Sequence, residues 1–178
     1  MADKRAPSQD QPPATENALG SQYVVIGEPE RKAERTNIIV MKFGGTSVAD
    51  ATCMKRVANR IVDARRLGHP VVAVVSARGD TTDELIEMAR EISDNPPARE
   101  MDMLLSTGER ISAALVAMAI QELGYEAISL TGSQAGIVTD TAHTKAKILD
   151  IRPQRILKAL EEDKIVLVAG FQGVSTDQ

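Results

Sequence analysis

The chain has 178 residues, of which 43% are hydrophobic, 26% charged and 2% aromatic, and its net charge is −4. This length fits one ordinary domain, or one domain with a tail, and the hydrophobic share is enough for a core. So few aromatic side chains argue against modules that bind nucleic acids by stacking, and the negative charge disfavours nucleic acids and anionic membranes as main partners. The single cysteine, Cys53, excludes an internal disulfide and a cysteine-rich zinc site.

The sequence also argues against export and against a metal site. No apolar run comes near the roughly 18–20 residues of a membrane span, and the N-terminus lacks the apolar segment of a secretory signal. We therefore expect a cytoplasmic protein with no membrane partner. Neither His69 nor His143 has a metal-ligand spacing, so no metal site is predicted.

Residues 1–36 differ in composition from the rest of the chain. They contain half of the eight prolines and six acidic residues, mixed with Ser, Gln and Asn. This composition predicts a disordered tail, in which only residues 23–26 could pair as a short strand. The acidic residues argue against an organellar transit peptide.

From residue 37 onward, apolar runs alternate with amphipathic segments. The runs predict buried strands at 37–42, 70–76, 125–130 and 165–169. The amphipathic segments predict helices at 48–67, 82–92, 98–123 and 153–163. We expect Ser47 to cap the first helix, and Gly108 is a place where the third helix could bend.

Strands that are apolar throughout and alternate with helices are typical of an α/β fold. The expected architecture is an open, mainly parallel sheet with helices on both faces, an αβα sandwich. The sequence stops at Gln178, directly after the last predicted strand and its turn, where α/β domains rarely end. We therefore expect a domain that is incomplete at its C-terminus.

Glycine and hydroxyl residues follow every predicted strand. Ligands of open α/β sheets bind at the carboxyl ends of the strands. Small residues there let a ligand approach the backbone, and free N–H groups bind anions. The segments concerned are 42–47, 76–82, 131–136 and 170–173. A ligand site is therefore predicted at this edge of the sheet.

The segment after the first strand carries the sharpest signal. Lys42 stands at the strand tip, Gly44 and Gly45 follow, and a helix begins soon after. A cation, exposed backbone donors and a helix N-terminus together suit a phosphate group. The segment is not a P-loop, because its lysine precedes the glycines. A tight turn beside a solvated lysine explains the same spacing, so both interpretations stay open.

Two further segments also have two explanations each. Ser76, Thr81 and Thr82 lie before or at a predicted helix start, where their hydroxyls could orient a phosphate or a carboxylate. Plain capping of the helix by Thr81 or Thr82 is the simpler explanation on spacing alone. Glu109 lies in an apolar helical stretch, where a carboxylate is costly unless it is paired. Its partner could be a substrate ammonium, or Arg110 or Arg90 if Glu109 is a surface residue.

Four segments, in the same order along the chain, are similar to motifs of the aspartokinases, which belong to the amino acid kinase family. They are 42–50 (KFGGTSVAD), 75–85 (VSARGDTTDEL), 106–110 (STGER) and 168–173 (VAGFQG). Residues 99–105 and 131–136 also resemble the monofunctional bacterial enzymes. The resemblance covers about residues 38–178 and leaves out the tail.

This resemblance implies an activity. The family uses ATP, usually as its Mg²⁺ complex, to phosphorylate the β-carboxylate of L-aspartate. The product, 4-phospho-L-aspartate, opens the biosynthesis of lysine, threonine and methionine. The implied small-molecule partners are L-aspartate and ATP, and the full-length enzyme would be a homo-oligomer.

The resemblance also assigns roles to residues. Lys42 would be catalytic and lie on the transferring phosphoryl group. Phe43, Gly44, Gly45 and Ser76 would complete the part of the site that binds the nucleotide, with the two glycines donating backbone N–H groups to phosphate oxygens.

Four other residues would bind substrate aspartate. Ser47, Thr81 and Thr82 belong to this set, and Glu109 would receive the α-ammonium group. These roles come from the resemblance, whereas residue spacing alone leaves them open.

The chain departs from the family in one respect. In aspartokinases a second half of the kinase domain follows at once, beginning with Gly-Arg-Gly-Gly-Ser-Asp, and it supplies the nucleotide pocket; regulatory ACT modules come after it. None of these lies within the 178 residues. Residues 37–178 are therefore expected to form the N-terminal part of an amino acid kinase domain. The alternatives are an inactive fragment that acts as a binding module and another member of the family.

Overall fold

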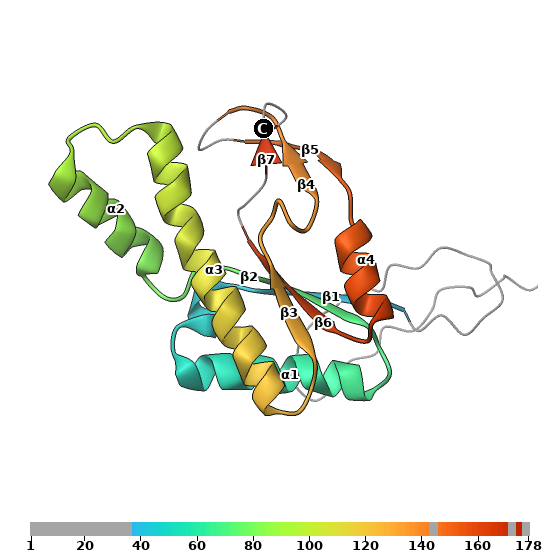
Figure 1. Ribbon diagram of the computed structural model, residues 1–178. Helices are drawn as coiled ribbons and strands as arrows, with labels where there is room; N and C mark the ends of the chain where they lie inside the picture. The colour runs from blue at the N-terminus through green and yellow to red at the C-terminus, as the bar shows by residue number, and fades with distance from the viewer. Residues whose placement is uncertain (1–36, 143–145, 171–173, 176–178) are drawn as a thin grey trace, which may run out of the picture.

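Four parallel strands organise the part of the chain that the computed structural model describes, residues 37–142, 146–170 and 174–175. The strands are β1 (Ile39–Phe43), β2 (Val71–Val75), β3 (Ala127–Leu130) and β6 (Ile165–Ala169). Their spatial order is β1-β2-β6-β3, and all three neighbouring pairs are parallel (Figure 1). Their carboxyl ends therefore share one edge of the sheet, as the sequence predicts. The predicted tail at 1–36 lies outside the described residues.

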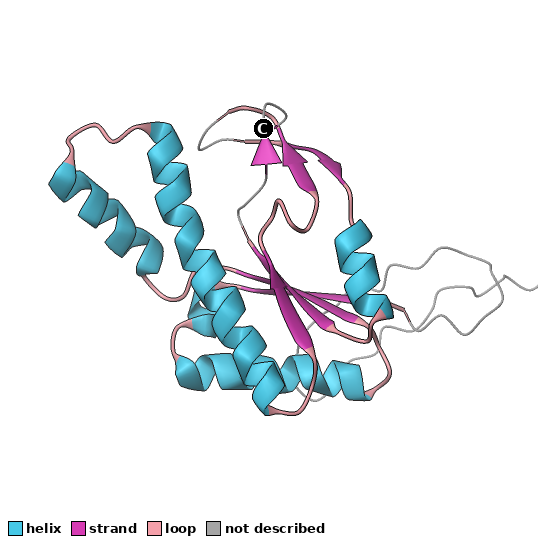
Figure 2. Cartoon of the chain, viewed as in Figure 1, coloured by secondary structure: helices cyan, strands magenta, loops and turns pink. Residues whose placement is uncertain are grey.

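Helices cover both faces of this sheet, which confirms the predicted αβα arrangement (Figure 2). On one face, α1 (Ala51–Arg66) and α3 (Ala98–Glu122) pack against the strands, and their fully buried side chains include Ile61 and Val116. On the other face, the short helix α4 (Gln154–Glu161) packs its Ala159 against β6. The two faces hold two separate apolar clusters because side chains of a strand alternate between the faces.

Helix α2 (Thr81–Ile92) stands apart from the sheet and packs against α3 (Figure 1). None of its residues is fully buried, and Met88 and Ile92 are largely exposed. The break between α2 and α3 contains the Asn-Pro-Pro segment 95–97 and falls between the predicted helices 82–92 and 98–123. Helix α3 then continues without interruption through Gly108.

Helix α3 is also long and apolar enough, by length and composition, to cross a membrane. The sequence predicts no uninterrupted apolar run of this length, because Glu109 and Arg110 divide the apolar residues of α3. Its buried residues pack on the sheet and on α1, which is the packing of a core helix.

A second, three-stranded sheet was not predicted from the sequence. It consists of β4 (Ile137–Thr139), β5 (Ile148–Ile151) and β7 (Val174–Ser175), in the order β5-β4-β7. Strand β4 has only three residues, too few to show a pattern. Strand β5 is exposed at every position, and its sequence, ILDI, lacks the strict alternation of apolar and polar residues that marks a half-buried strand.

The predicted cap of the first helix is wrong. Ser47 lies in a 3₁₀ turn, η1 (Gly45–Val48), and its backbone N–H donates to the carbonyl of Gly44 at 2.9 Å. Helix α1 begins later, and the carboxylate of Asp50 caps it by accepting the backbone N–H of Cys53 at 2.7 Å. This hydrogen bond lowers the pKa of Asp50 below its ordinary value of 3.8.

We expect Asp50→Ala to lower the melting temperature by roughly 2–4 °C, because the substitution removes the cap of α1. Since the pKa of Asp50 is lowered by folding, the ionised cap stabilises the fold above pH 3.8 and loses this effect as the pH falls below that value. Ser47→Ala is the matched control and should leave the melting temperature unchanged. Thermal unfolding followed by circular dichroism checks both variants; equal losses would contradict the assignment of the cap.

Candidate functional site

The loop after β1 lies directly against the loop after β2. The backbone N–H of Ser76 donates to the carbonyl of Phe43 at 3.0 Å, and that of Gly79 to the carbonyl of Gly45 at 3.1 Å. A Cβ atom added to Gly45 would lie 2.8 Å from the carbonyl oxygen of Ala77, so no larger residue fits there without a shift. Glycine at this position therefore brings two strand tips into backbone contact.

Gly44 differs from Gly45 in having open space beside it. A Cβ atom added to Gly44 would meet no atom within 4 Å. Packing therefore does not require a glycine there, and a ligand could approach this backbone closely. The side chain of Phe43, by contrast, is buried in the core and is therefore not available to a ligand. The carbonyl of Phe43 accepts the backbone N–H of Ser76.

Lys42 supplies a positive charge at the same edge. It pairs in register with Val74 of β2, and its side chain is exposed. Ile39, Met41 and Phe43 belong to the apolar cluster under α1 and α3, so alternation places Lys42 on the opposite face of the sheet. No ion pair to Lys42 occurs among the residues that the structure describes.

Capping does not explain the three hydroxyl groups of the loop after β2 and the start of α2. Helix α2 begins at Thr81, after Asp80, and no side chain caps it. Thr81 and Thr82 therefore occupy its first two positions. Within the described part of the chain, the hydroxyls of Ser76, Thr81 and Thr82 have no hydrogen-bond partner, which leaves them available to a ligand.

Glu109 is a buried carboxylate, and the interpretation as a surface residue is wrong. It is 8% exposed, and in the described residues it forms no ion pair with Arg110 or Arg90. Burial raises the pKa of Glu109 above its ordinary value of 4.5, and the backbone N–H groups of Glu109 and Ala77 counteract this only in part. A buried carboxylate without a cationic partner is suited to receiving one from a ligand.

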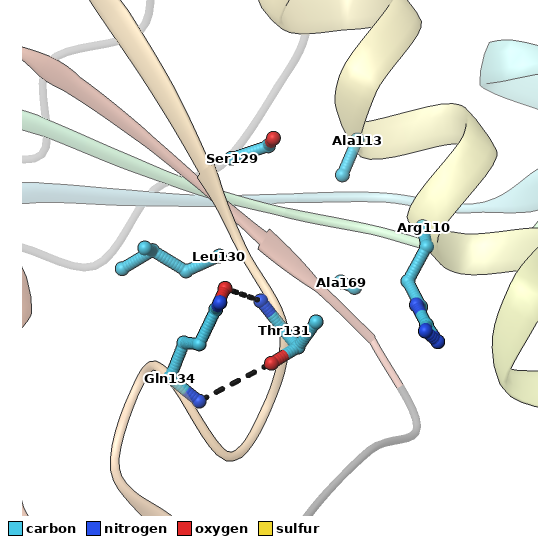
Figure 3. Close-up of a pocket in the computed structure, with 7 residues that line it drawn as sticks. All are labelled: Arg110, Ala113, Ser129, Leu130, Thr131, Gln134 and Ala169. Carbon is cyan, nitrogen blue, oxygen red and sulfur yellow. Dashed lines mark hydrogen bonds between the residues drawn. The ribbon is translucent and has the colours of Figure 1, made fainter.

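The neighbouring strand tips, of β3 and β6, line a separate pocket of about 150 Å³ (Figure 3). Arg110 reaches into it from α3, on the side opposite Gln134, which belongs to the turn after β3. Two hydrogen bonds between Gln134 and Thr131 stabilise this turn. The side-chain oxygen of Gln134 accepts the backbone N–H of Thr131 at 3.1 Å, and the backbone N–H of Gln134 donates to the Thr131 hydroxyl at 3.2 Å. Ser129 adds a second hydroxyl to the lining. One guanidinium and two hydroxyls suit a small anion.

The structure thus brings most of the predicted site residues to one edge, in two groups. Lys42, Gly44 and Ser76 lie at the tips of β1 and β2, while Thr81 and Glu109 lie beside them at the contact between α2 and α3. The pocket of Figure 3 contains none of these residues. The sequence predicts Arg110 only as a possible partner of Glu109. Tertiary packing places Arg110 beside the turn at 131–136, so sequence spacing could not indicate this position.

Ser47 and most of the fourth glycine-rich segment, 170–173, are not part of these two groups. Ser47 is exposed in η1, and its hydroxyl forms no hydrogen bond to another site residue in the described part of the chain. The predicted strand-end residues 171–173 lie outside the described residues. No group of three His, Cys, Asp or Glu side chains that could hold a metal ion occurs in residues 37–142, 146–170 and 174–175.

The chain is similar in sequence to known aspartokinases. The aspartokinases of Mycolicibacterium smegmatis and Mycobacterium tuberculosis are 61% and 59% identical to the chain over 140 residues. These matches cover 79% of the chain and 33% of each relative, so the chain spans about a third of the length of the curated relatives it matches.

Solved structures show the same fold. An aspartate kinase from Synechocystis matches with a TM-score of 0.66 and 49% identity, over 77% of this chain and 22% of that one. Escherichia coli aspartokinase III, solved in complex with aspartate and ADP, matches with a TM-score of 0.67 at 20% identity, over 79% of this chain and 42% of that one. The family model described as "Amino acid kinase family" matches residues 37–178. Because this match spans most of the chain, the protein belongs to the amino acid kinase family.

Proposed function

We propose that the chain carries the aspartate-binding part of an aspartokinase, which transfers a phosphoryl group from ATP to the β-carboxylate of L-aspartate. The observation that carries this proposal is the buried carboxylate of Glu109, which forms no ion pair in the described residues and directly follows Gly108, the residue of α3 that packs beside Thr81. The hydroxyls of Thr81 and Thr82 stand at the start of α2 without a hydrogen-bond partner in the same residues. Such a group suits an amino acid, whose ammonium needs an anion and whose carboxylate needs donors. The identity of about 60% to aspartokinases supports the same substrate.

In this proposal the two ends of the site perform different tasks. A β-carboxylate oxygen of aspartate attacks the γ-phosphorus of ATP, the bond from that phosphorus to the bridging oxygen breaks, and ADP leaves. Lys42 neutralises charge on the transferring group, while the backbone N–H of Gly44 and the hydroxyl of Ser76 bind phosphate oxygens. Phosphoryl transfer needs little more from a protein than such positioning and neutralisation.

Mg²⁺ would enter with ATP and neutralise its phosphates. The described residues hold no cluster of acidic side chains for a metal, so the ion would be bound chiefly by the nucleotide. Residues 37–178 would be one part of the kinase domain, in a cytoplasmic enzyme of lysine, threonine and methionine biosynthesis.

We also infer a homo-oligomer. Residues 111–120 of α3 contain no charged residue, although Ile111, Leu115 and Met118 are exposed on the helix surface. Apolar residues spaced in this way form a continuous stripe, which supports contact with a second copy.

A chimera tests the activity. Residues 37–178 replace the matching third of the Mycolicibacterium smegmatis aspartokinase, and acyl phosphate is trapped as a hydroxamate. We expect turnover that requires both ATP and L-aspartate, with no turnover on L-glutamate or carbamate. Calorimetric binding of L-aspartate to the chimera is the second measurement. A folded chimera that neither binds nor phosphorylates aspartate would contradict the proposal, and turnover on another acceptor would favour another member of the family.

Substitutions at Lys42 and Glu109 should change different kinetic constants. Lys42→Ala removes a charge that acts on the transferring group, so kcat should fall about 10²- to 10³-fold. Glu109→Gln removes one charge-assisted contact to a group that does not react, so the KM for aspartate should rise about 10- to 100-fold. Steady-state kinetics of the chimera, with both substrates varied, separates these effects.

Lys55→Ala is a control for loss of a positive charge, since Lys55 is an exposed residue of α1. It should change neither constant more than about twofold, as expected of a surface substitution. An unchanged KM for aspartate in Glu109→Gln, or an unchanged kcat in Lys42→Ala, would show that the corresponding role is wrong.

Glu109→Gln should also stabilise the unliganded chain at neutral pH. Burial raises the pKa of Glu109, so the folded state holds its proton more tightly than the unfolded state, and folding stability declines as the pH rises through the interval above 4.5. The neutral amide removes this loss. Urea unfolding should therefore show a gain for the variant at pH 7 that is absent below pH 4.5. A gain of the same size at both pH values would mean that ionisation of Glu109 is not its cause.

A further inference from the structure

Ala77 occupies an unusually crowded position at the end of β2. It is 4% exposed but belongs to neither of the two apolar clusters that cover the sheet. Its carbonyl oxygen lies where a side chain on Gly45 would stand, and its N–H faces the carboxylate of Glu109. The loop after β1 and helix α3 therefore both pack on this one small residue.

Gly108 is the residue of α3 that makes this packing possible. A Cβ atom added to Gly108 would lie 2.8 Å from the Cβ of Ala77, closer than such atoms approach one another in proteins, and 3.6 Å from the methyl carbon of Thr81. Glycine is an unfavourable residue inside a helix, yet Gly108 lies well inside the 25 residues of α3. The close approach explains why it stands there.

The contact between Gly108 and Ala77 lies beside two residues that we propose to bind aspartate, Glu109 and Thr81. Gly108 directly precedes Glu109 in α3, and the Cβ position that it leaves empty is next to Thr81. The contact between α3 and the loop after β2 therefore sets how far the carboxylate of Glu109 lies from the hydroxyl of Thr81. Neither Ala77 nor Gly108 has a polar side chain, so neither can bind the substrate through its side chain.

We propose that Gly108 is a positioning residue, whose missing side chain lets α3 approach Ala77 and so holds Glu109 and Thr81 at the separation that aspartate requires. This inference rests on the proposed function, because it assumes that both side chains bind aspartate. Enlarging Gly108 would push α3 away from the loop after β2. It would leave Lys42 and Gly44, at the tip of β1, where they are.

A size swap across the contact tests the proposal in the chimera. Gly108→Ala should raise the KM for aspartate about tenfold or more, since displacing a binding group by a fraction of an ångström weakens every contact it makes, and the KM for ATP should stay within about twofold. The double variant Gly108→Ala/Ala77→Gly moves the methyl group to the other side of the contact. It should bring the KM for aspartate back to within about threefold of the original value.

Ser112→Ala is the matched control. Ser112 is buried one turn further along α3 and its hydroxyl donates to the Gly108 carbonyl at 3.2 Å, so the substitution disturbs the same helix without adding an atom toward Ala77. It should leave both KM values unchanged. If Gly108→Ala yields no soluble enzyme, Ala77→Ser adds a single atom to the contact from the other side and should raise the KM for aspartate in the same selective way.

The outcomes separate the inference from the function on which it rests. If Glu109→Gln raises the KM for aspartate but Gly108→Ala does not, Gly108 does not position the site and the inference is overturned. Failure of the double variant to restore the KM, or an equal rise in both KM values, overturns it too, because it indicates general loss of structure. If Glu109→Gln itself has no effect, the proposed function fails first.

Discussion

The rest of the site depends on the close packing at the end of β2. Three neighbouring segments contact this end through glycines, because no larger residue fits there. Gly45, Gly108 and Gly170 each approach it so closely that an added Cβ atom would lie 2.8 to 2.9 Å from Ala77 or Val75. They come from three different elements: the loop after β1, helix α3 and the end of β6. Close packing of this kind tolerates little adjustment, since protein interiors are as dense as organic crystals. A larger residue at any of the three glycines would therefore force its element away from the end of β2.

The electrostatic design of the site follows from this packing. Lys42 approaches the strand edge from the face that carries α4, whereas Glu109 approaches it from the face covered by α3. The two groups lie on opposite faces of the sheet and form no ion pair with each other in the described residues, so both stay available to a ligand. In the described residues neither forms an ion pair, and for the buried Glu109 this is a cost to stability that a polar ligand would offset. Groups of this type often mark functional sites.

Much of the fold could be predicted because its signals are local. Continuous apolar runs marked the four parallel strands, and the predicted helices 48–67 and 82–92 end within one residue of the observed ends of α1 and α2. The cap of α1 was misplaced because Ser47 and Asp50 are both good caps, and only the 3₁₀ turn that occupies Ser47 decides between them. Strands β4 and β5 were not predicted, because backbone pairing with neighbouring strands, and not the pattern of their own side chains, makes them strands.

The candidate site was predictable in composition but not in arrangement. Glycines and hydroxyls at strand ends indicated where ligands bind, yet the sequence could not show whether Glu109 was a surface residue or a buried one. That depends on α3 crossing the end of β2, a contact between residues 32 positions apart, Ala77 and Glu109. The same holds for Arg110, which reaches the turn after β3 only because α3 lies across the strand ends.

Strand β5 has a practical consequence for handling this chain. It is an edge strand, since β4 is its one partner in the described sheet, and Ile148, Leu149 and Ile151 are each more than half exposed. Proteins usually protect such edges with lysine, proline or a covering segment, because an exposed apolar edge recruits further strands. The chain purified alone is therefore prone to aggregate through β5 as its concentration rises. A polypeptide that covers this edge would act as a solubilising partner as well as a structural one.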